Sequence, residues 1–220
     1  MKLHLAIAFF AVQSLHADWV IVQKTSTGDH DKSVTTQIKD DQIRSDVGND
    51  TTVLLNGKDG SVQMFMHAKK KSMRVNTASL KGLNSVAGKL LGGDDGKATT
   101  PKATGENVKV GEWNTEVYAW KSAVGSAKFY IAKDFPHFAS LNAAMDKVSK
   151  SMSNPMSAMF PDYASLPGMV VKSEITMLSR TVSTELVSAK EEPVPDSAFQ
   201  APEGYAEMKI PAFPSGLAPK

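Results

Sequence analysis

His30, His67 and His137 are the side chains best suited to acid–base catalysis or metal binding in this sequence, because imidazole titrates near neutral pH and ligates metals. They fall in a predicted turn, at the end of a predicted strand and at the start of a predicted helix. Their spacing matches no metal-binding motif, and the sequence has no G-x-S-x-G nucleophile motif. We therefore expect no catalytic residues, no metal, no cofactor and no enzyme.

Two polar stretches have the composition of ligand-binding loops without their spacing. Residues 92–97, GGDDGK, are one residue short of a phosphate-binding loop, and Ala98 stands where a hydroxyl residue is needed. Four oxygen-bearing residues are spaced somewhat as in a calcium loop: Asp29, Asp31, Ser33 and Asp40. Val34 occupies the position that requires glycine, and strands flank the stretch in place of helices. The sequence predicts a flexible loop and a solvated turn.

The chemistry that the composition does favour is apolar. The chain has 11 methionines and 9 phenylalanines, and methionine adapts its shape to irregular apolar partners. If the protein binds an apolar ligand, we expect these residues to line its site: Met64, Met66, Tyr118, Trp120, Phe129, Ile131, Phe138, Leu141, Met145, Val148 and Met152. The alternative is that they fill a core between helices and sheet, which is the commoner role of methionine at helical spacing.

Alternating β-branched, aromatic and polar residues predict a series of strands. The predicted strands are 19–24, 33–39, 42–47, 51–55, 61–67, 72–75, 113–121, 127–133, 169–178 and 181–190. Asp40-Asp41, Asn56-Gly57 and Asp59-Gly60 supply turns between neighbouring strands. Successive hairpins at this spacing leave no room for parallel crossovers, so the sequence predicts an antiparallel sheet.

The strongest hairpin lies within residues 111–136, and its pattern allows two registers. One pairs Ala119 with Phe129, and the other pairs Trp120 with Phe129. The second sets Glu116 opposite Lys133, a favourable charge pair, and we prefer it for that reason. It also collects one aromatic face: Tyr118, Trp120, Phe129 and Ile131.

Two stretches change to a helical period. Residues 76–91 and 136–152 each carry an apolar stripe on one helical face, which predicts two amphipathic helices. Residues 92–107 are small and polar, and we expect a flexible loop there. Residues 153–168 contain three prolines among apolar residues, so we expect this segment to lie against the core.

Residues 1–17 have the basic start, short apolar run and small final residue of a secretory signal peptide. The apolar run is far shorter than the roughly 20 residues that span a bilayer, and no later segment is apolar enough to be a transmembrane anchor. The mature chain would start at Asp18 and be exported to the periplasm or the medium. We expect a single domain at 18–205 and a Pro-rich tail at 206–220.

The net charge and the cysteine content limit the classes of partner and covalent modification that we expect. The net charge of +2 comes from balanced acids and bases spread along the chain, which argues against nucleic-acid binding. The absence of cysteine removes disulfides and a lipid-modified N-terminal cysteine. We therefore expect a soluble mature protein.

Five motifs spread along the mature chain resemble one bacterial family. They are DWV at 18–20, MHAKKK at 66–71, TEVYAW at 115–120, AKDFP at 132–136, and KEEPVP at 190–195 followed by Phe199, Pro202, Gly204 and Tyr205. The sequence is similar in these motifs to exported proteins known as domain of unknown function 4412. That family is similar in outline to the outer-membrane lipoprotein carrier fold.

The resemblance implies an α+β fold that is mainly antiparallel β: a curved incomplete barrel, or half barrel, with the two amphipathic helices covering its concave face. Such a fold can receive acyl chains, so we expect an exported protein of unknown activity that binds an apolar, lipid or acylated ligand between sheet and helices. The alternative is a structural or protein-interaction module of the cell envelope with a closed core, which meets a protein partner through a sheet edge or its tail.

Overall fold

The structure is a computed structural model, and it describes residues 18–28, 30–76, 100–122, 125–151, 163–177 and 179–208. The predicted signal peptide at 1–17 and the predicted first helix, from residue 77 on, lie outside these ranges. So do residues 92–99 of the predicted flexible loop and residues 153–162.

The described strands form one sheet. They are β1 (Trp19–Thr27), β2 (His30–Lys39), β3 (Gln42–Val47), β4 (Thr51–Asn56), β5 (Ser61–Met66), β6 (Lys71–Asn76), β7 (Lys102–Val110), β8 (Trp113–Lys121), β9 (Gly125–Ala132), β10 (Met169–Met177), β11 (Arg180–Glu191) and β12 (Ala206–Glu207). The described helices are α2 (Phe138–Ser151) and the 3₁₀ turns η3 (Tyr163–Ser165) and η4 (Asp196–Phe199). The predicted hairpins at Asp40-Asp41 and between β4 and β5 are confirmed.

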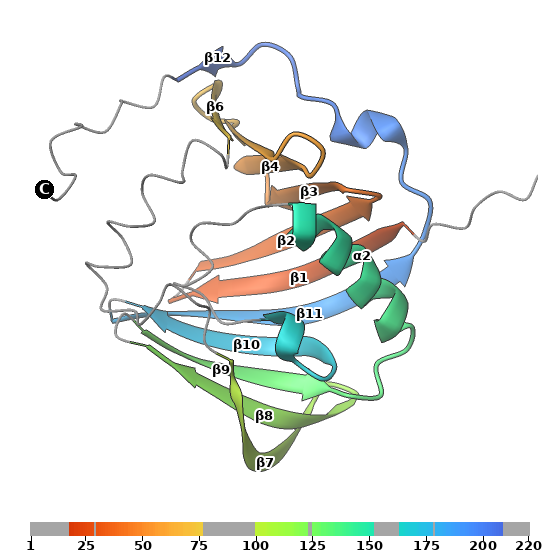
Figure 1. Cartoon of the computed structure of the whole chain (residues 1–220). Coiled ribbons are helices and arrows are strands. Elements are labelled where there is room, and N and C mark those ends of the chain that lie inside the picture. Colours follow the sequence, from red (N-terminus) through yellow and green to blue (C-terminus); the bar gives the residue numbers. More distant parts are fainter. Residues whose placement is uncertain are drawn as a thin grey trace, which may run out of the picture.

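The sheet has the strand order β12-β6-β5-β4-β3-β2-β1-β11-β10-β9-β8-β7, so it is open, with β12 and β7 at its two ends (Figure 1). β1–β6 and β7–β11 are two antiparallel meanders, joined where β1 pairs with β11. Only β12, which is parallel to β6, departs from the antiparallel pattern in the described chain. The fold is therefore α+β with a predominantly antiparallel sheet, as expected.

The second predicted helix is confirmed as α2, which lies across one face of the sheet (Figure 1). The described residues contain this one α-helix where the sequence predicted two, and the other prediction falls on residues outside the described ranges. The cover of the sheet that the structure describes therefore comes from α2 and η3.

The predicted register of the β8–β9 hairpin is wrong by two residues. Tyr118, instead of Trp120, lies opposite Phe129. A shift of two residues keeps each side chain on its predicted face, so the aromatic face survives the correction. The register differs from the prediction because the loop between β8 and β9 is short. Strand pairing continues to the end of β8, and the Ser122 N–H donates to the Gly125 carbonyl at 2.8 Å.

The predicted flexible loop at 92–107 is wrong from residue 102 onward, where β7 begins. β7 is an edge strand with mostly exposed side chains, so its sequence lacks the apolar alternation that reveals strands with a buried face. Gly105 has φ +81°, and the register shifts between Ala103 and Asn107, which marks a bulge. A bulged edge is a poor template for adding another strand.

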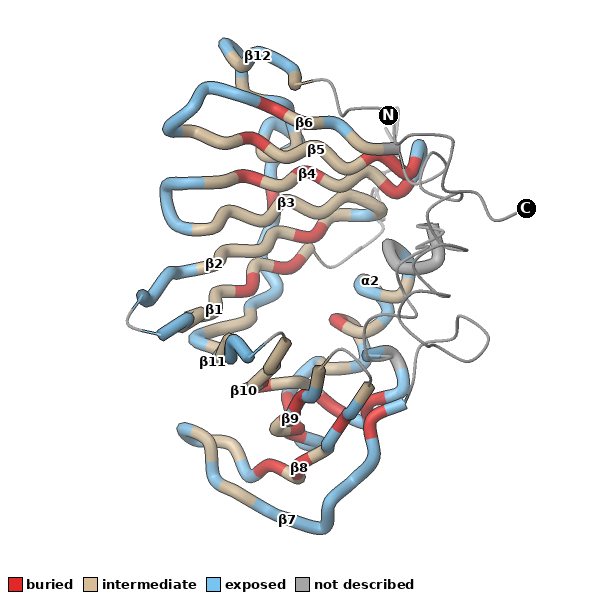
Figure 2. The backbone as a smooth tube through the Cα atoms, turned by 90° about the vertical axis from the view of Figure 1, so that its left-hand side faces the viewer, coloured by how far each residue is buried: buried red, intermediate tan, exposed pale blue. Residues whose placement is uncertain are grey.

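The helix face of the sheet holds the core around α2. Trp19, Ile21 and Ile38 are buried there against Leu141 of α2. In the β8–β10 region a second buried cluster joins strand residues to the residue that follows η3: Trp120, Ala127, Phe129, Ile131 and Leu166. Figure 2 shows buried positions alternating with half-buried ones along the strands, as a sheet with two unlike faces requires.

The segment that follows β11, residues 192–207, covers the opposite face of β3–β6, and we call it the C-terminal tail. The Tyr205 ring packs edge-on against Phe65, with ring centroids 5.3 Å apart. Arg44 donates to the carbonyl of Ala198 at 2.8 Å. These contacts hold the tail against the domain.

A chain of hydrogen bonds fastens the tail in this position. Thr52 donates to Asp46, so the Thr52 oxygen can accept the Nε2–H of His67 at 3.0 Å. His67 Nδ1 then accepts the Tyr205 hydroxyl at 2.5 Å. Burial raises the pKa of Asp46, but hydrogen bonds from Arg44 and Thr52 outweigh burial and hold that pKa below its ordinary value. His67 is therefore a structural histidine.

Tyr205→Phe should lower the free energy of unfolding by about 1–2 kcal/mol, because it leaves Nδ1 of His67 without its donor while it keeps the ring contact with Phe65. Urea denaturation measures the change. Tyr163→Phe is the matched control, because the Tyr163 hydroxyl has no partner among the described residues; we expect a change within about 0.5 kcal/mol. Equal losses in the two variants would contradict the role of the His67–Tyr205 bond.

Candidate functional site

The helix face continues across β3–β6 as an apolar surface. Strand pairing aligns Ile43, Leu55, Val62 and Val75 in one row, and Val53, Met64 and Met73 in the next. Met66 stands one row further on the same face. We call this set the apolar face: Ile43, Val53, Leu55, Val62, Met64, Met66, Met73 and Val75. Side chains of directly paired residues share a face, so antiparallel pairing in this register collects them from four strands.

Every side chain of the apolar face is half-buried. On the opposite face of the same strands, Thr52, Leu54 and Phe65 are 0%, 8% and 2% exposed. The more apolar side of the sheet is therefore the more accessible one, because the tail covers the other side. An accessible apolar patch of this kind marks a binding surface more often than a plain structural face.

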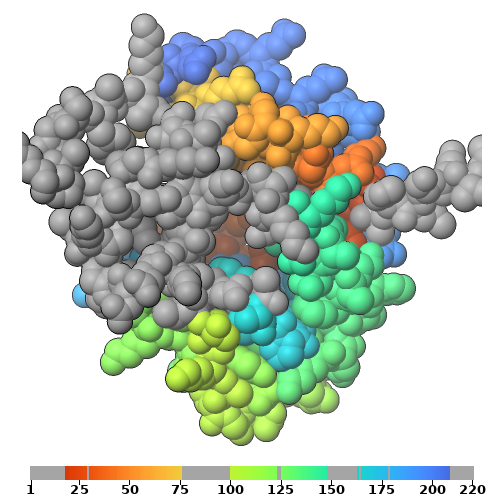
Figure 3. All heavy atoms as spheres, in the orientation of Figure 1, coloured from red at the N-terminus to blue at the C-terminus, as the bar shows by residue number. Residues whose placement is uncertain are grey.

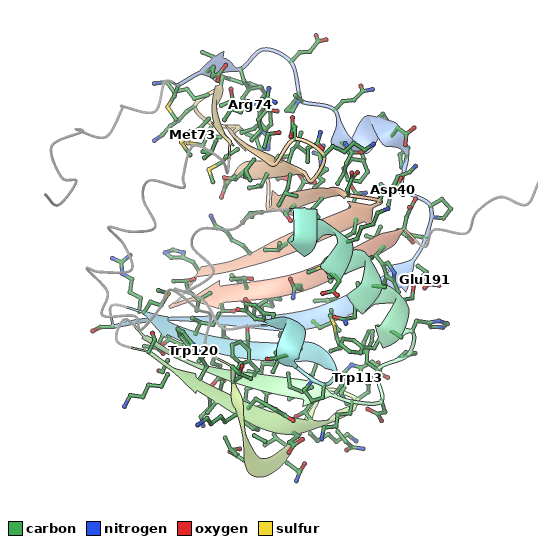
Figure 4. All side chains as sticks on the ribbon, viewed as in Figure 1. Asp40, Met73, Arg74, Trp113, Trp120 and Glu191 are labelled. Atoms are coloured by element: carbon green, nitrogen blue, oxygen red, sulfur yellow. The ribbon has the colours of Figure 1, made fainter. Side chains whose placement is uncertain are left out.

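α2 borders this surface. Its residue Leu141, which is 2% exposed, packs against side chains of β1 and β2. Ser140 donates to Glu191 at 2.7 Å, and Lys147 pairs with Asp40 at 3.4 Å. Asp40 and Glu191 lie beside the helix, where the strands β2 and β11 end (Figure 4). In Figure 3 the sheet, in the red of its first strands, is visible as a recess next to α2.

Polar side chains on the helix face satisfy one another. Thr36 and Ser45 form a hydrogen bond of 3.1 Å, and Thr25 and Thr184 form another of 3.1 Å. Paired hydroxyls cost little when an apolar molecule covers them, whereas unpaired ones would lose their water without compensation. The face can therefore accept an apolar ligand beyond its purely hydrocarbon rows.

The residues predicted to line a site separate into groups by burial. Met64 and Met66 belong to the apolar face, and Tyr118 and Phe138 are half-buried. Four are core residues with almost no exposed surface: Trp120 (4%), Phe129 (0%), Ile131 (0%) and Leu141 (2%). Met145 is 44% exposed on α2. The side chain of Val148 and the whole of Met152 lie outside the described residues.

Six residues of the apolar face were not predicted to line a site: Ile43, Val53, Leu55, Val62, Met73 and Val75. Their strands were predicted and their alternation was visible, but the pairing of β3–β6 is what brings them into two rows with Met64. Local alternation assigns side chains to one of two faces of a strand. It does not say which face a distant tail will cover.

The β7–β9 end contains a cavity of about 490 Å³, lined in part by Glu116, Ile131 and Lys133. The predicted charge pair is present as an ion pair, with Lys133 Nζ 2.5 Å from Glu116 Oε2. The hydrogen bond from Lys133 lowers the pKa of Glu116 and raises that of Lys133. Trp113 and Trp120 mark the two ends of β8 in Figure 4.

Among the described residues, no group of three or more His, Asp or Glu side chains is placed to hold a metal ion. Asp31, one of the residues spaced as in a calcium loop, instead pairs with Lys24 at 2.6 Å. No helix in the described ranges is both long and apolar enough to cross a membrane.

Three solved structures of low sequence identity are similar to this chain. An uncharacterized conserved protein from Thermus thermophilus superposes with a TM-score of 0.52 at 8% identity, over 88% of this chain and 91% of that one. The lipoprotein LppX of Mycobacterium tuberculosis gives 0.41 at 12% identity, over 81% and 88%. A LolA superfamily protein from Nitrosomonas europaea gives 0.31 at 9% identity, over 84% and 90%. The similarity to the Thermus thermophilus protein shows a common fold.

No curated protein is significantly similar to this sequence. The sequence model of one family, described as Domain of unknown function (DUF4412), matches residues 20–205. The match covers the sheet from β1 to the tyrosine that fastens the tail, and the chain belongs to the DUF4412 family.

Proposed function

We propose that this protein binds an apolar ligand, a lipid or the acyl group of an acylated molecule, on the helix face of its sheet between the apolar face and α2. The observation that carries the proposal is that the more apolar face of β3–β6 is the less buried one. Eight apolar side chains stay half-buried, while the tail buries the less apolar side. In this arrangement the accessible helix face of the open sheet receives the ligand beside α2.

The dimensions and energetics suit an acyl chain. Four adjacent strands span about 14 Å at the usual strand spacing. Burying about ten methylenes contributes roughly 8 kcal/mol before the cost of immobilising the ligand. Met64, Met66 and Met73 can adjust to chains of different length because methionine is flexible. We therefore expect saturable binding with tolerance for chain length.

We further propose that the protein is exported to the periplasm or the medium after removal of residues 1–17. Asp18, the first residue of the proposed mature chain, accepts a hydrogen bond from the Val194 N–H at 2.9 Å. Cleavage before Asp18 would thus leave an N-terminal residue that is already hydrogen-bonded to the folded domain. N-terminal sequencing of the exported protein should begin at Asp18, and retention of residues 1–17 would contradict the proposal.

The other candidate, an envelope interaction module that uses its edge or tail, has less support. The edge strand β7 is bulged, and the tail up to Glu207 is engaged with the sheet. A partner could reach the tail only at the cost of contacts that the tail already makes with the sheet, and the bulge makes β7 a poor template for an added strand.

The binding test is a titration of delipidated protein with a polarity-sensitive fatty-acid fluorophore, followed by competition with fatty acid, phospholipid and an acylated peptide. We expect a saturable signal that at least one competitor displaces. A signal that rises linearly with probe, with no displacement by any of the three, would contradict the proposed function.

A further inference from the structure

A second cavity lies in the β7–β11 part of the sheet and has a volume of about 850 Å³. This volume is in the range of small-molecule sites. Most side chains that line it point from the face opposite α2, so it is separate from the apolar face. Its lining includes three lysines and four hydroxyl residues: Lys102, Lys121, Lys128, Thr100, Ser126, Thr176 and Thr181.

Strand register explains why the lysines meet around a hollow. Lys102 pairs with Ala119, which pairs with Lys128, so the two lysines flank an alanine on one face. At the usual strand spacing their backbones are about 10 Å apart. In the neighbouring row, Lys121 pairs with Ser126. Small side chains form the floor, and long cationic ones surround it.

The cavity carries uncompensated positive charge. Glu174, the one carboxylate among its described lining residues, is already paired with Lys172 at 2.9 Å, and this hydrogen bond raises the pKa of Lys172. Lys102, Lys121 and Lys128 form no ion pair with any carboxylate of the described chain. Cations gathered around a concave surface focus a field that attracts anions.

Hydroxyl groups add hydrogen-bond donors at the same place. Thr176 and Thr181 lie 2.8 Å apart, oxygen to oxygen, in a bond in which either can donate. One hydroxyl proton of that pair is therefore left for another acceptor. Ser126, exposed beside them, offers another. Lysine ammonium groups together with hydroxyl donors suit a phosphate group, because several oxygens can accept from different directions.

We propose that this cavity binds a ligand that carries a phosphate group, held by Lys102, Lys121 and Lys128 with the hydroxyls of Ser126 and the Thr176–Thr181 pair. The phosphate belongs either to a small soluble molecule or to a lipid headgroup at a membrane surface. The site lies on the opposite face from the apolar face, so it does not depend on the proposed function.

Two probes distinguish the sources of phosphate. Calorimetric titration with pyrophosphate tests a soluble ligand, and flotation with phosphatidylcholine vesicles, with or without phosphatidic acid, tests a headgroup. We expect binding of pyrophosphate, or of the vesicles that contain phosphatidic acid, and we expect it to weaken as salt rises. If neither probe binds, or if plain phosphatidylcholine binds equally well, the proposal is overturned.

The double variant Lys102→Gln with Lys128→Gln should weaken binding about tenfold or more, since each lost charge pair near a surface contributes up to about a factor of five. Lys190→Gln is the matched control: Lys190 is an exposed lysine of β11 outside the cavity, and its loss should leave affinity unchanged. All three changed lysines are exposed, and thermal unfolding should show that the variants stay folded. Equal affinities for the double variant and the wild type would overturn the proposal.

Discussion

Met64→Asp is expected to weaken binding of the fatty-acid probe by about 100-fold or more, because the ligand would have to bury a carboxylate that has no partner on the apolar face. Met64 sits between Val53 and Met73 in the second row of that face, where a ligand covering the surface must contact it. The probe titration with the delipidated variant measures the change. A carboxylate at this position remains half-exposed without ligand, so the folded protein should tolerate it far better than the complex does.

Two matched variants show whether the effect belongs to the apolar face. Met64→Leu keeps volume and hydrophobicity, and we expect affinity within about threefold of the wild type. Gln63→Asp places the same carboxylate one residue earlier on β5, on the opposite face of the sheet, and should leave ligand affinity unchanged. Equal loss in Gln63→Asp and Met64→Asp would mean that the charge acts through folding, and it would contradict a site on the apolar face.

Phe129→Ala is expected to lower the free energy of unfolding by about 3–5 kcal/mol, because it removes a fully buried aromatic side chain and leaves a cavity. Phe129 is 0% exposed and packs edge-on against Tyr163, with ring centroids 5.4 Å apart. Chemical denaturation measures the loss. Val187→Ala, at a side chain that is 65% exposed, serves as control and should change stability by about 0.5 kcal/mol or less.

The Phe129→Ala variant also separates the two roles that the sequence allowed for Phe129, a core residue or a ligand-lining residue. A large loss of stability with ligand affinity retained in the folded fraction would assign Phe129 to the core. Little loss of stability together with loss of ligand binding would return it to the ligand site, and it would contradict the burial described above.

Strands that have one buried face could be predicted from the sequence almost to the residue. β8 and β4 show this, because their alternation and their turn residues agree. β7 could not be predicted, since an edge strand with exposed, small and polar side chains has no apolar face to reveal it. The pairing of β1 with β11 was equally out of reach, because it joins strands that lie at opposite ends of the domain's sequence and leaves no local trace.

The apolar chemistry of the candidate site could be predicted from the sequence, but the residues that form the site could not. Met64 and Phe129 are equally apolar in sequence, yet one is half-buried and the other is sealed beneath Tyr163. What decides between them is which segment covers each part of the sheet. The tail provides the clearest case: by burying the Phe65 side of β5, it leaves the Met64 side as the accessible one.

The most direct test is native mass spectrometry of the protein purified without detergent from the compartment to which it is exported, followed by organic extraction of whatever is bound. We predict a discrete added mass that extracts as a lipid or an acylated molecule and that is absent from Met64→Asp. A bare protein mass that persists after incubation with envelope lipids would contradict an apolar ligand site on this sheet.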